Sequence, residues 1–252
     1  MTGKVAVVVL VDVKPAARAW GFLHFLRCRA GLGRVDGLTF HKVLGSGHEG
    51  GFGLRPSLSR QGLFCVFRDD VAATAFLEEH PWVRAYRDHA KEFLTVRLRA
   101  FSSRGAWAGA CPFDVATPAP ATGPVAALTR ASIRPALAAR FWRHSPPAER
   151  SLETARGCLL ATGLGEAPLL RQATFTLWES AAAMDAYART GAHLEAIRAA
   201  GRGRFFSESM FSRFVPYDPR GSWKGLPLGQ LLLGSATPST CVPELCEPIA
   251  SW

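Results

Sequence analysis

The seven histidines of this 252-residue chain are its first candidates for metal binding and proton transfer, because imidazole titrates near neutral pH and is a common metal ligand. They do not cluster, and a histidine that stands alone more often has a structural role. His193 lies in the last long expected helix, within the sequence His193-Leu194-Glu195. That sequence matches the H-x-E part of the zinc deaminase signature, but the P-C-x-x-C part is missing, so a deaminase is not supported.

Other short motifs also fail to define an active site. The segment Gly45–Gly50 (GSGHEG) matches the G-x-G-x-x-G pattern of dinucleotide-binding proteins, but Gly51, Gly53 and Pro56 follow where a helix would have to begin. We therefore expect a mobile loop, which is placed to cover a pocket. The six cysteines form no C-x-x-C pair, so reduced structural thiols are favoured over a zinc site.

Composition indicates a folded protein with a basic surface. Hydrophobic residues make up 48% of the chain, which is enough for a sizeable core, and no apolar run reaches the length of about 18 residues that a spanning helix needs. The run Val5–Val11 is too short for a signal peptide, so we expect a cytoplasmic protein. The net charge of +10 suits anionic partners, but the cations are too scattered to favour nucleic acid.

Hydrophobic periodicity divides the first half of the chain into six elements in the order strand, helix, strand, strand, helix, strand. We expect the strand Val5–Val13, a helix from Pro15 to about Leu32, the strands Leu38–Leu44 and Gly62–Phe67, a helix over Val71–Ala90 and the strand Phe93–Phe101. Asp69 or Asp70 is a suitable N-cap for the second helix.

The second half repeats this order. We expect the strand Val125–Ile133, a helix from Pro135 to about Arg143, the strands Cys158–Leu164 and Leu170–Trp178, a helix over Ala181–Ala200 capped by Ser180, and the strand Phe205–Val215. His144 precedes Pro146 and Pro147, and we place it in a turn.

Matching motifs support a duplication. Arg104–Gly109 (RGAWAG) closes the first half and Arg220–Gly225 (RGSWKG) closes the second. Two ferredoxin-like βαββαβ units whose sheets face each other would form a pseudo-dimeric α+β barrel with its helices outside. We assign residues 1–117 and 125–225 to the repeats, 118–124 (PAPATGP) to a linker, and the proline-containing residues 226–252 to an extended or disordered tail.

Several longer segments together resemble the spheroidene monooxygenase family, the carotenoid 2-ketolases of purple phototrophic bacteria. These segments are Phe101–Trp107 (FSSRGAW), Arg140–Arg143 (RFWR), Gly163–Pro168 (GLGEAP), Gln172–Trp178 (QATFTLW), Ala188–Arg198 (ARTGAHLEAIR) and Gly221–Trp223 (GSW). The resemblance covers about residues 4–225 and is strongest from Phe101 onward, whereas the tail from Leu226 departs from the family pattern.

The resemblance implies a haem-dependent oxygenase that acts on acyclic carotenoids ending in a methoxy group, such as spheroidene. Such enzymes oxygenate the allylic C2 position with O2 and electrons from a ferredoxin-type donor, and two hydroxylations followed by loss of water leave a ketone. The cofactor would be haem b, with its iron. Because the substrate lives in a bilayer, we expect peripheral contact with an anionic inner or photosynthetic membrane, no nucleic-acid partner, and scope for a homo-oligomer.

The haem implied by the resemblance needs an axial ligand and partners for its propionates. His193 is the ligand that we favour, because haem-binding α+β barrels often offer a helix-borne histidine, and His24 and His89 are the alternatives. Three arginines are candidates to pair with the anionic propionates: Arg140, Arg143 and Arg171.

Four further residues are candidates for contact with oxygen or the polyene. Gln172 is placed to hydrogen-bond bound oxygen or a propionate, and Trp142, Phe175 and Trp178 are placed to line an apolar slot. Aromatic residues at strand spacing more often belong to a core. Three other functions stay open: a cofactor-free or haem-degrading monooxygenase of the same barrel type, a non-enzymatic carrier of a hydrophobic ligand, and, least supported, a nucleic-acid binder.

Overall fold

A computed structural model describes residues 3–51, 55–167, 169–191, 194–195, 198 and 203–229. The first half contains β1 (Val5–Val13), α1 (Arg18–Gly31), β2 (Leu38–Gly47), β3 (Pro56–Phe67), α2 (Asp70–Glu79), α3 (Pro81–His89) and β4 (Ala90–Gly105). The second half contains β5 (Val125–Ile133), α4 (Ala138–Glu153), β6 (Cys158–Ala167), β7 (Arg171–Trp178), α5 (Ala181–Ala188), β8 (Phe206–Trp223) and the short β9 (Leu226–Pro227).

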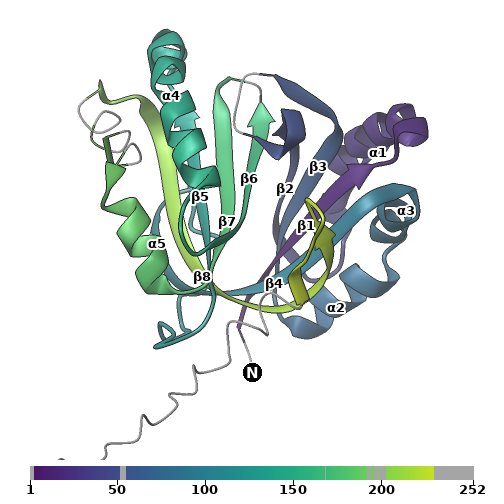
Figure 1. Ribbon diagram of the computed structural model, residues 1–252. Helices are drawn as coiled ribbons and strands as arrows, with labels where there is room; N and C mark the ends of the chain where they lie inside the picture. Colours follow the sequence, from purple (N-terminus) through teal and green to yellow (C-terminus); the bar gives the residue numbers. More distant parts are fainter. Residues whose placement is uncertain are drawn as a thin grey trace, which may run out of the picture.

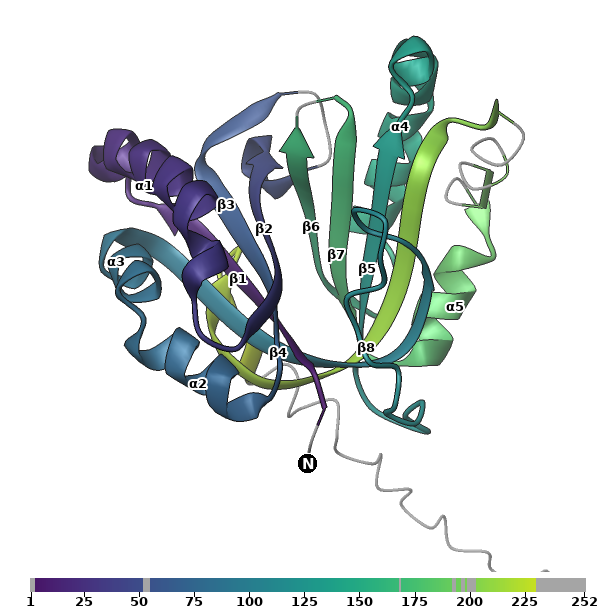
Figure 2. The same cartoon turned by 180° about the vertical axis from the view of Figure 1, so that it is seen from behind.

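Eight of these strands close into one antiparallel barrel. The strand order is β4-β1-β3-β2-β6-β7-β5-β8, and the pairing of β8 with β4 completes the ring. Helices α1, α2 and α3 lie outside the barrel on one side, and α4 and α5 lie outside it on the other (Figures 1 and 2). The predicted α+β barrel is confirmed.

The strand register shows the duplication residue by residue. Val5 pairs with Phe67 as Val125 pairs with Trp178, and Ala6 pairs with Leu98 as Ala126 pairs with Phe214. These pairs define matching positions in the two repeats.

The motif that closes each repeat occupies equivalent positions. Trp107 and Trp223 match, and both are fully buried. The backbone amides of Ala108 and Gly109 donate to Glu208, while those of Lys224 and Gly225 donate to Glu92. Each repeat therefore ends in a turn that is anchored on a carboxylate of the other repeat.

Side chains from both repeats fill the barrel interior. Val8, Leu10 and Phe64 from the first half pack with Phe175 and Phe214 from the second half, all at most 1% exposed. Two cavities that the described residues form lie outside the barrel, between the sheet and its helices.

Three expected helices differ from the structure. The helix expected over Ala181–Ala200 is interrupted, because α5 ends at Ala188 and Arg189 and Thr190 are not helical. The helix expected over Val71–Ala90 is two helices, because Pro81 lacks the amide that a continuous helix would need and instead begins α3 behind the N-cap His80. The helix expected to stop near Arg143 continues through Pro146 and Pro147 to Glu153, so His144 lies in α4 rather than in a turn.

Candidate functional site

A cavity of about 580 Å³ lies on the outside of the barrel where β2 meets β6, between α1 and the first turns of α4. Its volume is in the range of small-molecule sites. Its walls are mostly apolar and include Phe22 and Phe25 of α1, Leu58 of β3 and Trp142 of α4. The cavity is therefore suited to a hydrophobic ligand.

The floor of this cavity is built from glycines. Gly45 of β2 pairs with Gly165 of β6, and Gly163 lies further along β6. A Cβ atom built on Gly45 would meet nothing nearer than the carbonyl oxygen of Gly165 at 4.0 Å. The buried Ser46 hydroxyl donates to the carbonyl oxygen of Gly163 over 2.7 Å and fixes the junction of the two strands. The backbone at these glycines, which has no side chains, therefore presents a flat surface to the cavity.

The sequence suggested that the glycine-rich segment Gly45–Gly50 is a loop, but only part of it is irregular in the structure. Gly45, Ser46 and Gly47 belong to β2, and His48–Gly50 forms a single 3-10 turn. The expectation of a mobile loop was wrong for the strand part, because Gly45 and Ser46 pair with Gly165 and Leu164 of β6. The sequence could not show this pairing, since the two strands lie in different repeats.

Trp142 and Gln172, predicted as catalytic residues, line this same cavity. The half-buried Trp142 donates its indole N–H to the carbonyl oxygen of Leu169 over 3.0 Å, which fixes the ring. Gln172 pairs with Gly165 in the sheet, so it borders the glycine floor.

The matching glutamine of the first repeat is held quite differently. Gln61 also lines the cavity, where it donates to the carbonyl oxygen of Gly21 over 3.1 Å and accepts from the Tyr86 hydroxyl over 2.7 Å. The Gln172 side chain has no hydrogen-bond partner among the described residues, so its amide is available to a ligand.

Phe175 and Trp178 lie on opposite faces of β7. Phe175 is fully buried in the barrel interior. Trp178 packs under α5 against Tyr187, with ring centroids 5.3 Å apart, and donates its indole N–H to the Thr176 hydroxyl over 2.9 Å. Neither ring lines the cavity that contains Trp142 and Gln172, so the structure does not bring the three aromatic candidates together.

His193 lies outside the described residues, so its role as haem ligand stays a prediction. The alternatives His24 and His89 stack on Trp20, with centroid distances of 4.6 and 3.8 Å. The His24 Nε2 atom lies 3.1 Å from the carbonyl oxygen of Trp82, and burial lowers the pKa of this imidazole. Both rings help to pack α1 and α3, a structural role.

One residue pair on the outer face of the sheet differs in burial between the two repeats. In the first repeat the paired residues Val9 and Leu63 are 0% and 1% exposed beneath the helices. The matching pair in the second repeat is Thr129 and Thr174, and Thr129 is exposed in the middle of β5. Among the described residues, Thr129 is thus exposed on the outer face of the second repeat, where Val9 of the first repeat is buried.

The three arginine candidates lie near this half of the molecule. Arg140 and Arg143 are on α4, Arg171 begins β7, and all three are exposed. The Arg140 guanidinium lies 5.7 Å from the centroid of the Phe205 ring. Within the described part of the chain none of the three forms an ion pair, so their charges are free to meet an anion.

Sequence similarity to two relatives shows to which family this chain belongs. The spheroidene monooxygenase of Rubrivivax gelatinosus is 56% identical over 223 residues, which cover 88% of this chain and 86% of that protein. The spheroidene monooxygenase of Rhodobacter capsulatus is 35% identical over 210 residues, covering 82% and 87%. The chain belongs to the spheroidene monooxygenase family. It is therefore an oxidoreductase, and the resemblance seen in the sequence is confirmed.

Other comparisons concern the fold alone. No family model matches the chain. The crystal structure of an aldoxime dehydratase superposes with a TM-score of 0.58 at 11% identity, over 85% of this chain and 81% of that one. This member of the spheroidene monooxygenase family therefore shares its barrel with a solved structure that is distant in sequence.

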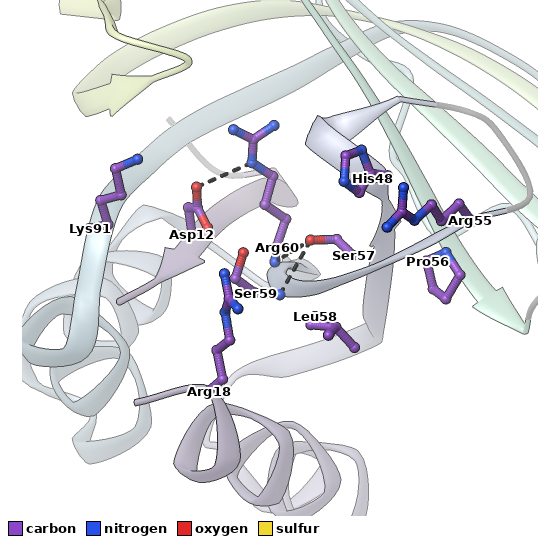
Figure 3. Close-up of a pocket in the computed structure, with 10 residues that line it drawn as sticks. All are labelled: Asp12, Arg18, His48, Arg55, Pro56, Ser57, Leu58, Ser59, Arg60 and Lys91. Carbon is purple, nitrogen blue, oxygen red and sulfur yellow. Dashed lines mark hydrogen bonds and ion pairs between the residues drawn. The ribbon is translucent and has the colours of Figure 1, made fainter. Parts of the chain in front are cut away.

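A second cavity of about 610 Å³ adjoins the glycine-floored one in this family member and shares five lining residues with it: Arg18, Pro56, Ser57, Leu58 and Arg60. Figure 3 shows its cationic lining, in which Arg18, Arg55, Arg60 and Lys91 are joined by His48. The carboxylate in this lining is Asp12, which binds Arg60 Nε over 3.2 Å. Sequence reasoning missed this cavity, because its cations come from α1, β4, β3 and the residue before β3.

The described residues give two further findings on metals and membranes. Among them, no group of three or more His, Cys, Asp or Glu side chains is arranged to hold a metal ion. No helix in the described ranges is long and apolar enough to cross a membrane.

Proposed function

We propose that this chain is a haem-dependent monooxygenase that converts C2 of acyclic methoxy carotenoids such as spheroidene into a ketone, using O2 and a ferredoxin-type electron donor. The observation that carries the proposal is the 56% identity to a protein named spheroidene monooxygenase over 88% of the chain. The apolar cavity at the junction of β2 and β6 supports it, because a polyene needs a dry, flat site.

The cavity fits the carotenoid end that would react. A conjugated chain is planar and apolar, and the floor at Gly45 and Gly165 has no side chain to hold it away from the sheet. Trp142 forms a wall fixed by its hydrogen bond to Leu169. Gln172 supplies a polar group with no partner among the described residues, which suits contact with a methoxy oxygen or with oxygen near C2.

The residues of the second repeat fit a haem. A porphyrin holds iron by itself, so the protein has to add an axial atom, a flat apolar face and partners for the propionates. In the described structure Thr129 is exposed, whereas Val9 at the matching position is buried. His193 matches Trp82 of the first repeat by distance from the helix caps Ser180 and Asp69.

The first repeat gives the His193 proposal a geometric basis. A Cβ atom built on Gly31 at the end of α1 would lie 2.1 Å from the Trp82 ring, so Trp82 packs directly on that helix. The matching position of the second repeat carries His193, and α4 is the helix that corresponds to α1. Arg140, Arg143 and Arg171 would then pair with the propionates.

When bound, the haem would supply the activation of O2. His193 would hold the iron through a neutral imidazole nitrogen, and a hydrogen bond from its other nitrogen would fix the tautomer. Trp142 and the glycine floor would exclude water and orient C2, while Gln172 would hold the reacting oxygen or the methoxy group in place.

The reaction balances as two insertions. Each one breaks a C–H bond at C2, forms a C–OH bond and reduces the second oxygen atom to water, using two electrons from the ferredoxin-type donor and two protons from solvent. The resulting geminal diol loses water to leave the ketone.

An absorption spectrum followed by a turnover assay tests this function. Protein made in haem-sufficient cells is expected to show a Soret band that shifts on adding CO, and to convert spheroidene in detergent with reduced ferredoxin. His193→Ala is expected to lower haem occupancy or change the iron spin state, whereas the control His41→Gln is not. Full turnover without haem would contradict the proposal.

Two other outcomes would assign a different function. Carotenoid retained without conversion would indicate a carrier. Loss of haem under reductant and O2, with release of iron, would indicate a haem-degrading enzyme.

A further inference from the structure

We propose that the outward face of α1, together with Leu58 and Leu169, docks on the surface of an anionic lipid bilayer and delivers the lipid-soluble substrate into the adjoining cavity. This inference rests on the proposed function and deepens it, since it locates where the substrate enters. Below, the docking face means Phe22, Leu23, Leu26, Leu58 and Leu169.

Exposed hydrophobic side chains gather around one cavity. Among the described residues eight large hydrophobic side chains are exposed, and five of them make up the docking face. Phe22, Leu58 and Leu169 line the mouth of the glycine-floored cavity, and Leu23 and Leu26 extend the same helix. Single exposed apolar residues are ordinary, but a group around a cavity mouth indicates a binding surface.

Helix α1, which carries most of the docking face, has apolar residues on two sides. Its inner side, with Gly21, His24 and Cys28, is buried against the sheet. The outer side presents Phe22 and Leu26 at i, i+4 spacing with exposures of 61% and 46%, so it is apolar as well. Burial of the helix against its own barrel therefore leaves a second apolar stripe without a partner in the described structure.

Charge around the docking face favours an anionic surface. Between Val13 and Asp36 the sequence has five cations and no acidic residue. These cations are Lys14, Arg18, Arg27, Arg29 and Arg34. Cations that flank an apolar stripe are typical of helices lying in the interface of anionic lipid.

The second cavity adds to this charge. Arg18, Arg55 and Lys91 stand in it with one carboxylate, Asp12, which is already bound to Arg60 (Figure 3). It opens beside Leu58, the most exposed leucine of the described chain at 74%. A lipid phosphate at this position would be paired while Leu58 and Phe22 enter the acyl region.

Vesicle flotation tests the docking face. The full chain is expected to float with phosphatidylglycerol-containing vesicles at low ionic strength, to bind less at high salt, and to bind weakly to phosphatidylcholine alone. Leu23→Ser/Leu26→Ser is expected to lower the partition coefficient by about tenfold or more, because two leucine side chains no longer enter the apolar layer. Val71→Ser, at a site 78% exposed on α2, is the matched control and should bind as the wild type does.

Two double arginine substitutions of equal charge change, together with an activity measurement, complete the test. Arg27→Gln/Arg34→Gln is expected to weaken binding to anionic vesicles, whereas Arg84→Gln/Arg156→Gln, of equal charge, is not. Leu23 and Leu26 do not line the cavity, so turnover of detergent-dispersed spheroidene should survive their substitution.

Three results would overturn the docking inference. One is that the wild-type protein does not bind anionic vesicles but still converts spheroidene in detergent, a result that would contradict the docking inference and remain consistent with the proposed function. Another is equal binding of the α1 and α2 variants. The third is a wild-type dimer that Leu23→Ser/Leu26→Ser converts to a monomer without any vesicle binding, which would show that a second copy covers the face.

Discussion

Adding a side chain to the cavity floor should lower activity without lowering stability. A Cβ atom built on Gly45 would have no neighbour within 4.0 Å other than the Gly165 carbonyl oxygen, which lies at ordinary contact distance. Gly45→Ala therefore fits the strand and, by restricting the unfolded chain, should leave the free energy of unfolding unchanged or raise it by about 0.5 kcal/mol. In the cavity, however, the new methyl group occupies the surface on which the polyene would lie.

The expected loss of kcat/KM in Gly45→Ala follows from the free energy by which one carbon atom changes binding in an apolar pocket. One extra methylene-sized group costs about 1–3 kcal/mol of transition-state binding, which is roughly 10- to 200-fold in kcat/KM. We expect Gly45→Ala to lose about that much and Gly45→Leu to lose more. The assay is ketone formation from spheroidene, measured with the melting temperature of each variant.

Gly3→Ala is the matched control for this series. A Cβ atom on Gly3 meets nothing within 4 Å, so both activity and stability should stay unchanged. Wild-type kcat/KM in Gly45→Leu, with haem content intact, would refute the assignment of this cavity to the substrate.

Two further predictions concern stability and thiol chemistry. Burial raises the pKa of Glu208, but hydrogen bonds from Gly109 and the charge of the buried Arg130 outweigh it and hold the pKa below its usual value. Glu208→Gln should therefore lower stability by about 2 kcal/mol, or about 4–8 °C in Tm. Because the folded-state pKa of this carboxyl is lowered, its contribution is present above the unfolded-state pKa and is lost as the pH falls through the folded-state pKa, so the difference should shrink in acid; a constant difference would contradict the reasoning. Burial raises the pKa of Cys28 to about 12, so iodoacetamide at about pH 8 should label the exposed Cys111 and spare Cys28 until the protein unfolds, as peptide mapping would show.

The sequence predicted the barrel because its repeats are locally consistent. The run Val5–Val13 is buried at every position, and RGAWAG and RGSWKG end the matching strands β4 and β8. Where local rules failed, tertiary packing overrode them. Helix α4 continues past Pro146 and Pro147 and brings Leu152, 7% exposed, into contact with the cluster around Trp178.

The candidate site could be predicted only in part. Trp142 and Gln172 were found because they stand in family segments, and both line the cavity. The glycine floor was missed, because the pairing of Gly45 with Gly165 joins residues of different repeats and no spacing along the chain encodes it. Phe175 could not be distinguished from a pocket residue, since inward and outward strand positions look alike when both faces are covered.

The most direct test of haem-dependent oxygenation measures ketone formation from spheroidene under O2 labelled with heavy oxygen, in preparations that range from haem-free to fully loaded. We expect a rate that rises in proportion to haem content. We also expect a ketone that carries the label, because both oxygens of the diol come from O2. A rate independent of haem content, or a ketone unlabelled before exchange with water, would contradict the proposed chemistry.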